Sequence, residues 1–357
     1  MAKTVLKFEP DFAVAPGATL KEILDEKGIS QAALATRAGM TEKNVSQIIN
    51  GVAPISYETA EKFEMALGVP ASFWNQRELA YRETLVRIAA NERMKADIEW
   101  LDEIPVDVLK ERGFIDADAS DEVLVRSSLK FFGVSSVDAW RETWGSPVAK
   151  FRGGDASDKR PGYVATWLRI GDLQAEKVEA APFNPDEFRR ALLDAKAMTM
   201  RADGLKQLQE RFAKAGVVVV FTKEIPSAAV SGATRWLTKD KALIQLSLKF
   251  KTADQVWFTF FHEAGHILLH GKKQMFLEFG VNNETDEERE ANQFARDLLI
   301  PPEHARRLPY LKSAAQINVF AESIGISPSI VVGRLQRDEL LSWKTNLNNL
   351  KPKLGWK

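Results

Sequence analysis

The feature that most constrains this chain is the pentapeptide His262-Glu263-Ala264-Gly265-His266, which lies inside a strongly apolar segment. Its surroundings predict a helix from about Asp254 to His270, ended by Gly271. On such a helix His262 and His266 lie one turn apart on the same face, so their ring nitrogens can converge on one cation. The chain has no cysteine, which leaves only His and carboxylate ligands for zinc. The sequence therefore predicts a zinc site built on these two histidines.

Glu263 suggests what such a site could do. It lies about 100° around the helix from His262, which is a poor position for a third ligand. It can instead reach a water molecule at the metal, whose pKa zinc lowers toward about 7, and act as the general base. Two alternatives stay open: a pair of surface histidines on an amphipathic helix, and an intact motif that has lost catalysis.

A third zinc ligand has to come from another segment. The next expected helix, from about Asp286 to Ile300, offers Glu288 and Asn292 beside its apolar stripe. We expect Glu288 to be the ligand and Asn292 to orient a histidine from outside the metal shell. Glu290 is the second choice, and a solvated helix N-terminus is the alternative for either carboxylate. His270 lies about 6 Å beyond His266 along the helix axis, too far to join the same cation.

The order of helix and strand signals around the motif is typical of an α+β domain. Before the two helices described above, they predict a helix at Leu205–Ala215, a buried strand at Val217–Phe221 and a hairpin of Thr234–Leu237 with Ala242–Leu248. After those two helices, they predict two more at Ala314–Ile324 and Pro328–Leu341. We expect the α+β domain to span residues 205–305 and a helical extension to span residues 306–357.

This C-terminal arrangement resembles a known family. Glu288 is followed by Ala291-Asn292, by Phe294-Ala295 and by the ending Leu298-Leu299-Ile300-Pro301, as in the ImmA/IrrE family of zinc metallopeptidases. The resemblance covers roughly residues 205–305 and implies a zincin-like peptidase fold with Glu288 as a zinc ligand. It also implies cleavage of repressor proteins and fusion to a helix-turn-helix domain. Ile300 stands where the family often has Met.

The N-terminal residues 1–83 predict a compact all-α domain. Five short helices are expected, over Thr19–Lys27, Gln31–Arg37, Glu42–Asn50, Tyr57–Leu67 and from Ala71 to about Glu83. The turn Ala38-Gly39-Met40 between the second and third helices consists of small or flexible residues, as in a helix-turn-helix. Amide and hydroxyl side chains on the third helix are suited to reading base edges in the major groove. The candidate DNA contacts are Gln31, Thr41, Lys43, Asn44, Ser46, Gln47 and Asn50.

The charge of this domain limits the prediction. Between Gly17 and Glu83 there are seven Lys and Arg residues against nine Asp and Glu residues. Phosphate binding must therefore depend on the local placement of Arg37, Lys43 and Lys62 and on dimerisation. A helical protein-interaction domain without DNA contact is the alternative.

Residues 17–80 also resemble a family, the Xre-type helix-turn-helix of HigA-type antitoxins. The resemblance rests on Asn50-Gly51-Val52-Ala53-Pro54-Ile55-Ser56-Tyr57-Glu58-Thr59-Ala60 and on Leu67-Gly68-Val69-Pro70-Ala71-Ser72-Phe73-Trp74. It implies a homodimer that binds its own operator DNA and a toxin partner.

The remaining features set the context of the two domains. Residues 84–204 predict a helical middle region without an assigned role, with a mobile loop or linker from Gly153 to Gly162. The net charge is zero, the first residues do not look like a signal peptide, and no apolar run is long enough for a membrane span, so we expect a cytoplasmic protein.

Together these features predict a multi-domain transcription regulator, an antitoxin-type autorepressor with a zinc metallopeptidase domain. That domain would cleave a repressor, a partner or the protein itself. In the alternative, the protein is a DNA-binding antitoxin or sensor whose zinc domain binds metal or a signal without hydrolysing peptides.

Overall fold

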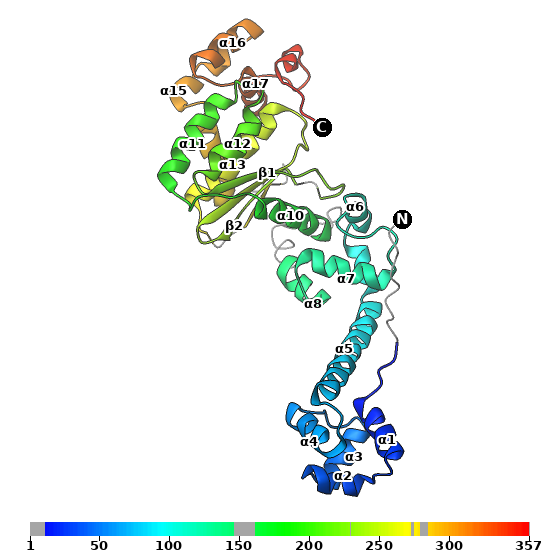
Figure 1. Ribbon diagram of the computed structural model, residues 1–357. Coiled ribbons are helices and arrows are strands. Elements are labelled where there is room, and N and C mark those ends of the chain that lie inside the picture. Colours follow the sequence, from blue (N-terminus) through cyan, green and yellow to red (C-terminus); the bar gives the residue numbers. More distant parts are fainter. Residues whose placement is uncertain (1–10, 146–160, 229, 273–274, 279–284, 357) are drawn as a thin grey trace, which may run out of the picture. The chain divides into compact units, whose positions relative to one another are not determined.

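The computed structural model describes residues 11–145, 161–228, 230–272, 275–278 and 285–356 (Figure 1). It divides into two compact units. The first comprises Met1–Ile98 and Ser120–Val125, and the second comprises Glu99–Ala119 and Arg126–Lys357. The first unit is helical and the second combines helices with one small sheet, which confirms the predicted multi-domain architecture.

The first unit is built from short helices ended by glycines. They are α1 (Pro16–Glu26), α2 (Gln31–Ala38), α3 (Glu42–Ile49), α4 (Tyr57–Leu67) and the long α5 (Ala71–Ala96). The Ser30 and Thr41 hydroxyls cap α2 and α3 by accepting from backbone N–H groups three residues on. Gly39, with a φ of 61°, makes the left-handed turn between these two helices. Leu20, Leu34 and Trp74 are fully buried in the core that the helices share.

Several helices differ from their expected bounds: α1 begins at Pro16 rather than Thr19, the helix that begins at Pro328 ends at Arg337 rather than Leu341, and two further differences are larger. α5 was predicted to end near Glu83 but continues to Ala96, because residues 84–96 contain no Gly or Pro that would end it. Pro161 and Gly162 were predicted to belong to a loop but begin α10 (Pro161–Glu176), since proline is well tolerated in the first helical turn. Residues 153–160 of that predicted loop lie outside the described residues.

The second unit begins with helices and continues into the sheet. Its earlier helices are α6 (Val106–Glu111), α7 (Asp121–Phe132, which starts in the first unit), α8 (Val137–Trp140), α10, α11 (Pro185–Met198) and α12 (Gly204–Ala213). After them come β1 (Val217–Phe221), β2 (Gly232–Thr238), β3 (Lys241–Leu246), α13 (Ala253–Leu269), β4 (Phe276–Glu278), α14 (Asp286–Leu299), α15 (Pro302–Ala305), α16 (Ala314–Ser323) and α17 (Pro328–Arg337).

The sheet has the strand order β1-β3-β2-β4, in which β1 is parallel to β3 and β2 is antiparallel to both of its neighbours. Side chains alternate along β1, so its two faces meet different helices. Val217 and Val219 face the core formed with α11, α12 and α13, whereas Val218 and Val220 pack against α10. The hairpin of β2 and β3 was predicted; β4, only three residues long, was not.

The C-terminal helices α16 and α17 complete the main core. Phe320, Val331 and Leu335 are buried in the same cluster as the sheet and α13. No single described helix is long and apolar enough to cross a membrane; only α16 and α17 taken together, bent by 111°, have the length and composition.

Candidate metal centre

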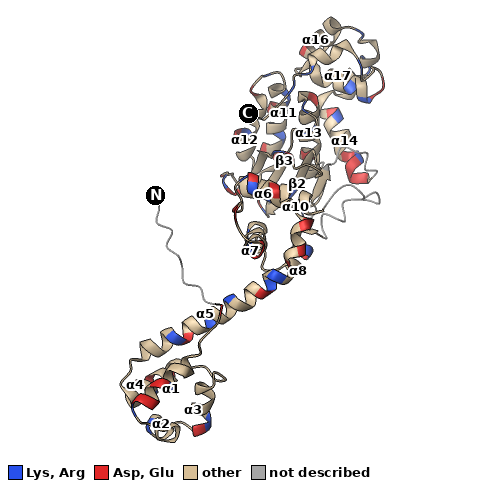
Figure 2. Cartoon of the chain, turned by 90° about the vertical axis from the view of Figure 1, so that its right-hand side faces the viewer, with Lys and Arg blue, Asp and Glu red and all other residues tan. Residues whose placement is uncertain are grey.

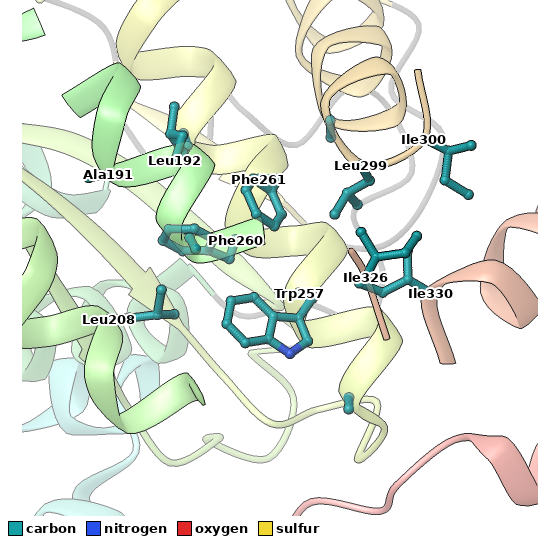
Figure 3. Close-up of a cluster of buried hydrophobic side chains, with 14 of the residues drawn as sticks. Ala191, Leu192, Leu208, Trp257, Phe260, Phe261, Leu299, Ile300, Ile326 and Ile330 are labelled. Carbon is teal, nitrogen blue, oxygen red and sulfur yellow. The ribbon is translucent and has the colours of Figure 1, made fainter. Parts of the chain in front are cut away.

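Helix α13 is held in place by its apolar side chains. Trp257, Phe260 and Phe261 point into the cluster between α11, α12 and α14 and are almost completely buried (Figure 3). Because the helix is fixed by this packing, the face that carries His262 and His266 has one orientation toward α14.

The structure brings His262, His266 and Glu288 together. The Nε2 atoms of the two histidines are 3.0 Å apart. Glu288 places Oε2 at 3.1 Å from His262 Nε2 and Oε1 at 3.5 Å from His266 Nε2. In a tetrahedral zinc site with bonds of about 2.0–2.1 Å, neighbouring ligand atoms are about 3.3 Å apart. Two imidazoles and one carboxylate at these spacings fit zinc and leave its fourth position to a small ligand.

Burial and mutual contact set the protonation of these groups. Burial lowers the pKa of His266 to about 4, although its hydrogen bond with Glu288 acts in the opposite direction. Burial raises the pKa of Glu288, but the hydrogen bonds with His262 and His266 outweigh this effect and bring it to about 2. At neutral pH the cluster is therefore deprotonated at His266 and Glu288, the state in which it binds a cation.

A second set of side chains orients the two imidazoles. Asn292 Oδ1 is 3.2 Å from His262 Nδ1, and this contact makes Nδ1 the donor and leaves Nε2 as the ligand atom. His266 Nδ1 is 2.9 Å from His270 Nδ1, and His270 Nε2 is 3.2 Å from Glu290 Oε2. Glu290, the second choice for a ligand, therefore pairs with His270 and lies outside the metal cluster, because it points to a different side of α14 from Glu288.

The sheet supplies three contacts that the sequence did not reveal. The Thr234 hydroxyl lies 2.6 Å from Glu263 Oε2 and fixes the rotation of this buried carboxylate. A Cβ at Gly232 would come within 2.5 Å of Glu263 Oε1, so only glycine leaves room for the carboxylate there. On the edge strand, the Phe276 ring stacks on His266 with a centroid distance of 3.9 Å. Gly232 and Thr234 lie on β2 and Phe276 lies on β4, and the pairing of these two strands places all three residues beside the motif.

A pocket of about 330 Å³ opens beside the cluster, between α13, α14 and α17. His262 and Glu288 lie in its wall together with Thr259 and Asn292. A small molecule or a peptide segment can therefore reach the candidate metal centre from this side.

The candidate DNA-contacting residues fall into two groups in the first unit: side chains open to solvent, and side chains already hydrogen-bonded within the chain. Gln31, Lys43 and Asn44 are exposed, and Gln47 is half-buried. The Thr41 hydroxyl is engaged as the cap of α3, and the Asn50 side-chain amide donates to the Ser46 carbonyl at 2.8 Å and also reaches the Ser46 hydroxyl. Figure 2 shows both basic and acidic residues distributed over this unit, for example along α5.

Lys62, one of the candidate phosphate contacts, forms an ion pair with Glu58 at 2.7 Å. Because both side chains are exposed, this ion pair is weak and competes only partly with phosphate, and Arg37 and Lys43 remain the other cations expected to contact phosphate.

Two regions of the chain match known families. Residues 20–74 match the helix-turn-helix family, and residues 213–336 match a peptidase family described as the IrrE N-terminal-like domain. The chain combines a helix-turn-helix domain with an IrrE-like domain. These matches confirm the helix-turn-helix and ImmA/IrrE resemblances seen in the sequence.

The comparisons with individual proteins are sparser. No curated protein matches the chain. Among solved structures, the chain is similar to an addiction module antidote protein of the HigA family from Coxiella burnetii. The identity is 22%, the TM-score is 0.22, and the match covers 24% of this chain and 94% of that one.

Proposed function

We propose that this protein is a DNA-binding transcription regulator whose second unit is a zinc-dependent endopeptidase. The observation that carries the peptidase proposal is the buried cluster of His262, His266 and Glu288 with Glu263 held beside it by Thr234. This cluster lies within the region that matches the IrrE-like peptidase family.

His262, His266 and Glu288 are the residues that would hold zinc. When bound, zinc polarises a peptide carbonyl and lowers the pKa of water, so that hydrolysis proceeds at neutral pH. The chain's own residues supply proton transfer and orientation. The Glu263 carboxylate accepts the proton of the attacking water and returns it to the nitrogen of the leaving amine. Thr234 holds that carboxylate, while Asn292 and His270 hold the two imidazoles.

The peptidase proposal is tested with the full-length protein and a proteome-derived peptide library, whose new termini are identified by mass spectrometry. The wild type with zinc should cleave a defined set of peptides. Glu263→Gln should keep the zinc content and lose activity by about 10²- to 10⁴-fold, whereas His262→Ala should lose the zinc. Glu322→Gln, at an exposed position on α16, is the matched control.

Two outcomes would contradict this proposal. Equal zinc in the wild type and in His262→Ala would contradict the metal site. A zinc-loaded wild type that cuts nothing in the library, the chain itself or the product of a neighbouring gene would favour the alternative, a sensor that binds metal without hydrolysis.

The DNA-binding proposal rests on the match to the helix-turn-helix family and on the exposed polar face of α3. We assign operator binding to residues 30–50 of a homodimer, with Gln31, Lys43, Asn44 and Gln47 as the candidate contacts. The resemblance of residues 17–80 to HigA-type antitoxins in sequence makes autorepression and a toxin or repressor partner part of the same proposal. Since DNA binding requires access to the chromosome, the protein is assigned to the cytoplasm.

A mobility shift on the upstream region of the protein's own gene tests this second proposal. Alanine at Lys43, Asn44 and Gln47 should abolish the specific shift, and the residual binding should weaken steeply as salt increases. Lys21→Ala, at an exposed position on α1, serves as the control. A triple variant that shifts the DNA as well as the wild type would exclude α3 as the recognition helix.

A further inference from the structure

The pocket beside the candidate metal centre extends well beyond the metal ligands. Its far wall is formed by side chains from the C-terminal half of α14 and from α17, with Phe250, Phe258 and Trp343 as apolar neighbours. Along α14, Glu288, Asn292 and Arg296 follow one another at intervals of four residues, so they line one face of the helix. The pocket thus has the zinc ligands toward one end and Arg296 toward the other.

Three guanidinium groups meet at this far end. Arg334 and Arg337 from α17 line the pocket together with Arg296. Burial lowers the pKa of Arg296, and the nearby positive charges of Arg334 and Arg337 lower it further, whereas Asp338 and Asp297 act in the opposite direction. Cations brought together in a partly buried site repel one another, so this arrangement costs free energy unless an anion joins it.

Two of these arginines have donors that the described residues leave unused. Arg296 Nε and Arg334 Nη1 are buried, and neither has a hydrogen-bond partner within the described parts of the chain. A buried N–H without a partner costs about 1–3 kcal/mol, which a ligand can recover by accepting the hydrogen bond. These two unpartnered donors therefore indicate that a hydrogen-bond acceptor enters the pocket from outside the chain.

Two of the carboxylates near this end already have cationic partners. Asp338 accepts from Arg334 Nε at 2.6 Å, and Asp254 is 2.7 Å from Lys351 Nζ. Among the described residues no carboxylate lies within ion-pair distance of Arg296. Asp297 is a third carboxylate near Arg296, so three negative charges stand against four cations and the far end keeps a net positive charge.

The spacing along α14 relates this subsite to the metal. Glu288 and Arg296 are eight residues apart, which is about 12 Å at the helical rise of about 1.5 Å per residue. An extended peptide advances about 3.3 Å per residue, so about four of its residues cover this length.

We propose that Arg296, Arg334 and Arg337 form a subsite for an acidic side chain of the peptide substrate, about four residues from the bond that is cleaved. This assignment rests on the proposed peptidase function and adds a substrate class to it. A carboxylate satisfies the requirements of the subsite, because it accepts several hydrogen bonds and neutralises the clustered positive charge. The apolar side chains of Phe250, Phe258 and Trp343 suit the residues between the acidic side chain and the cleaved bond.

Specificity profiling of the full-length, zinc-loaded protein tests the subsite. In the peptide library, Asp and Glu should be enriched at one position about four residues from the cleaved bond. Arg296→Gln and Arg337→Glu should each lower kcat/KM for acid-containing peptides about tenfold and should remove the enrichment. Arg337 is exposed, so its substitution leaves the core intact even if Arg296→Gln folds poorly. Arg306→Gln, exposed and outside the pocket, should behave as the wild type.

The outcomes separate this inference from the peptidase proposal. Cleavage without an acidic preference, or with a preference that both variants retain, overturns the subsite and leaves the peptidase standing. If the wild type cuts nothing, immobilised Glu263→Gln protein is used to capture peptides from the same library. Capture of acidic peptides by this protein, and loss of that capture in the double variant Glu263→Gln with Arg337→Glu, support the subsite. Capture of peptides without enrichment of acidic residues overturns it. Inorganic phosphate is the second probe. If it raises the Tm of the wild type but not of Arg337→Glu, and acidic peptides are not preferred, the peptide subsite is overturned and the three arginines are assigned to free phosphate.

Discussion

At the residue scale, three groups of the candidate centre, the two histidines and Glu263, are each oriented by a partner outside the metal shell. Asn292 is bonded to His262, His270 to His266 and Thr234 to Glu263. Such partners fix the tautomer of an imidazole and the rotation of a carboxylate, and they often affect activity by one to two orders of magnitude. The preorganisation of this centre therefore depends on residues from β2 and α14 and on the residue that follows α13.

Thr234 is the residue whose orienting role is most directly testable. Thr234→Val removes the hydroxyl bond to Glu263 and preserves the side-chain shape. We expect kcat/KM to fall about 10- to 100-fold, with an unchanged zinc content. Thr234→Ser should restore most of the activity, because it restores the donor. Steady-state kinetics on a peptide identified from the library measures this, and full activity in the valine variant would show that the bond plays no part in positioning Glu263.

The buried histidine and glutamate predict how the zinc-free protein responds to acid. The pKa of His266 is about 4 in the folded protein against an ordinary 6.5, so below pH 6.5 the unfolded chain binds the additional proton. The pKa of Glu288 is about 2 against an ordinary 4.5, which has the same sign below pH 4.5. The free energy of unfolding should therefore fall as the pH decreases from about 6.5 to 4, with His266 contributing on the order of 3 kcal/mol.

Urea unfolding of the chelated protein over a pH series measures this dependence. His266→Gln should flatten the curve between pH 6.5 and 4, because the titrating group is gone. A curve that keeps its slope in that variant would assign the acid sensitivity to other groups.

At the scale of the elements, helices and their ends were largely accessible from the sequence. Capping residues, glycines and apolar periodicity predicted α1 to α4, α13 and α14 closely, and the spacing of His262 and His266 predicted their common face. The placements of Gly232 and Thr234 were not predictable, because they depend on the register of β2 against β4 and on how the sheet packs against α13. Glu288 could be chosen over Glu290 only through the apolar stripe and the family resemblance.

The contact between α1 and α3 gives a test at this scale. A Cβ at Gly17 would lie 2.0 Å from the Ile48 carbonyl oxygen, so α1 approaches the backbone of α3 directly. Gly17→Ala must displace one helix and should destabilise the first unit by about 1–3 kcal/mol. Specific operator binding should weaken in parallel. Ala18→Gly, one residue further along the same helix, is a control for helix propensity, and chemical denaturation with a mobility shift measures both effects. An alanine variant with unchanged stability would contradict this close approach.

At the scale of the whole molecule, the two functions belong to cores that share no residue. The core of the first unit lies within residues 20–74, whereas His262, His266 and Glu288 lie among the elements of the second core. Zinc that binds only the folded second unit stabilises it by mass action, by about 4 kcal/mol at a free concentration of 1,000 times the dissociation constant. The first unit gains nothing directly from that binding.

Calorimetry of the full-length protein should therefore show two thermal transitions, of which a chelator lowers only one. For a unit of this size, the loss of about 4 kcal/mol corresponds to a decrease in Tm on the order of 10 °C. His262→Ala should show the lower transition without chelator, and Gly17→Ala should move only the other one. A single transition that shifts as a whole in both variants would mean that the two units unfold together.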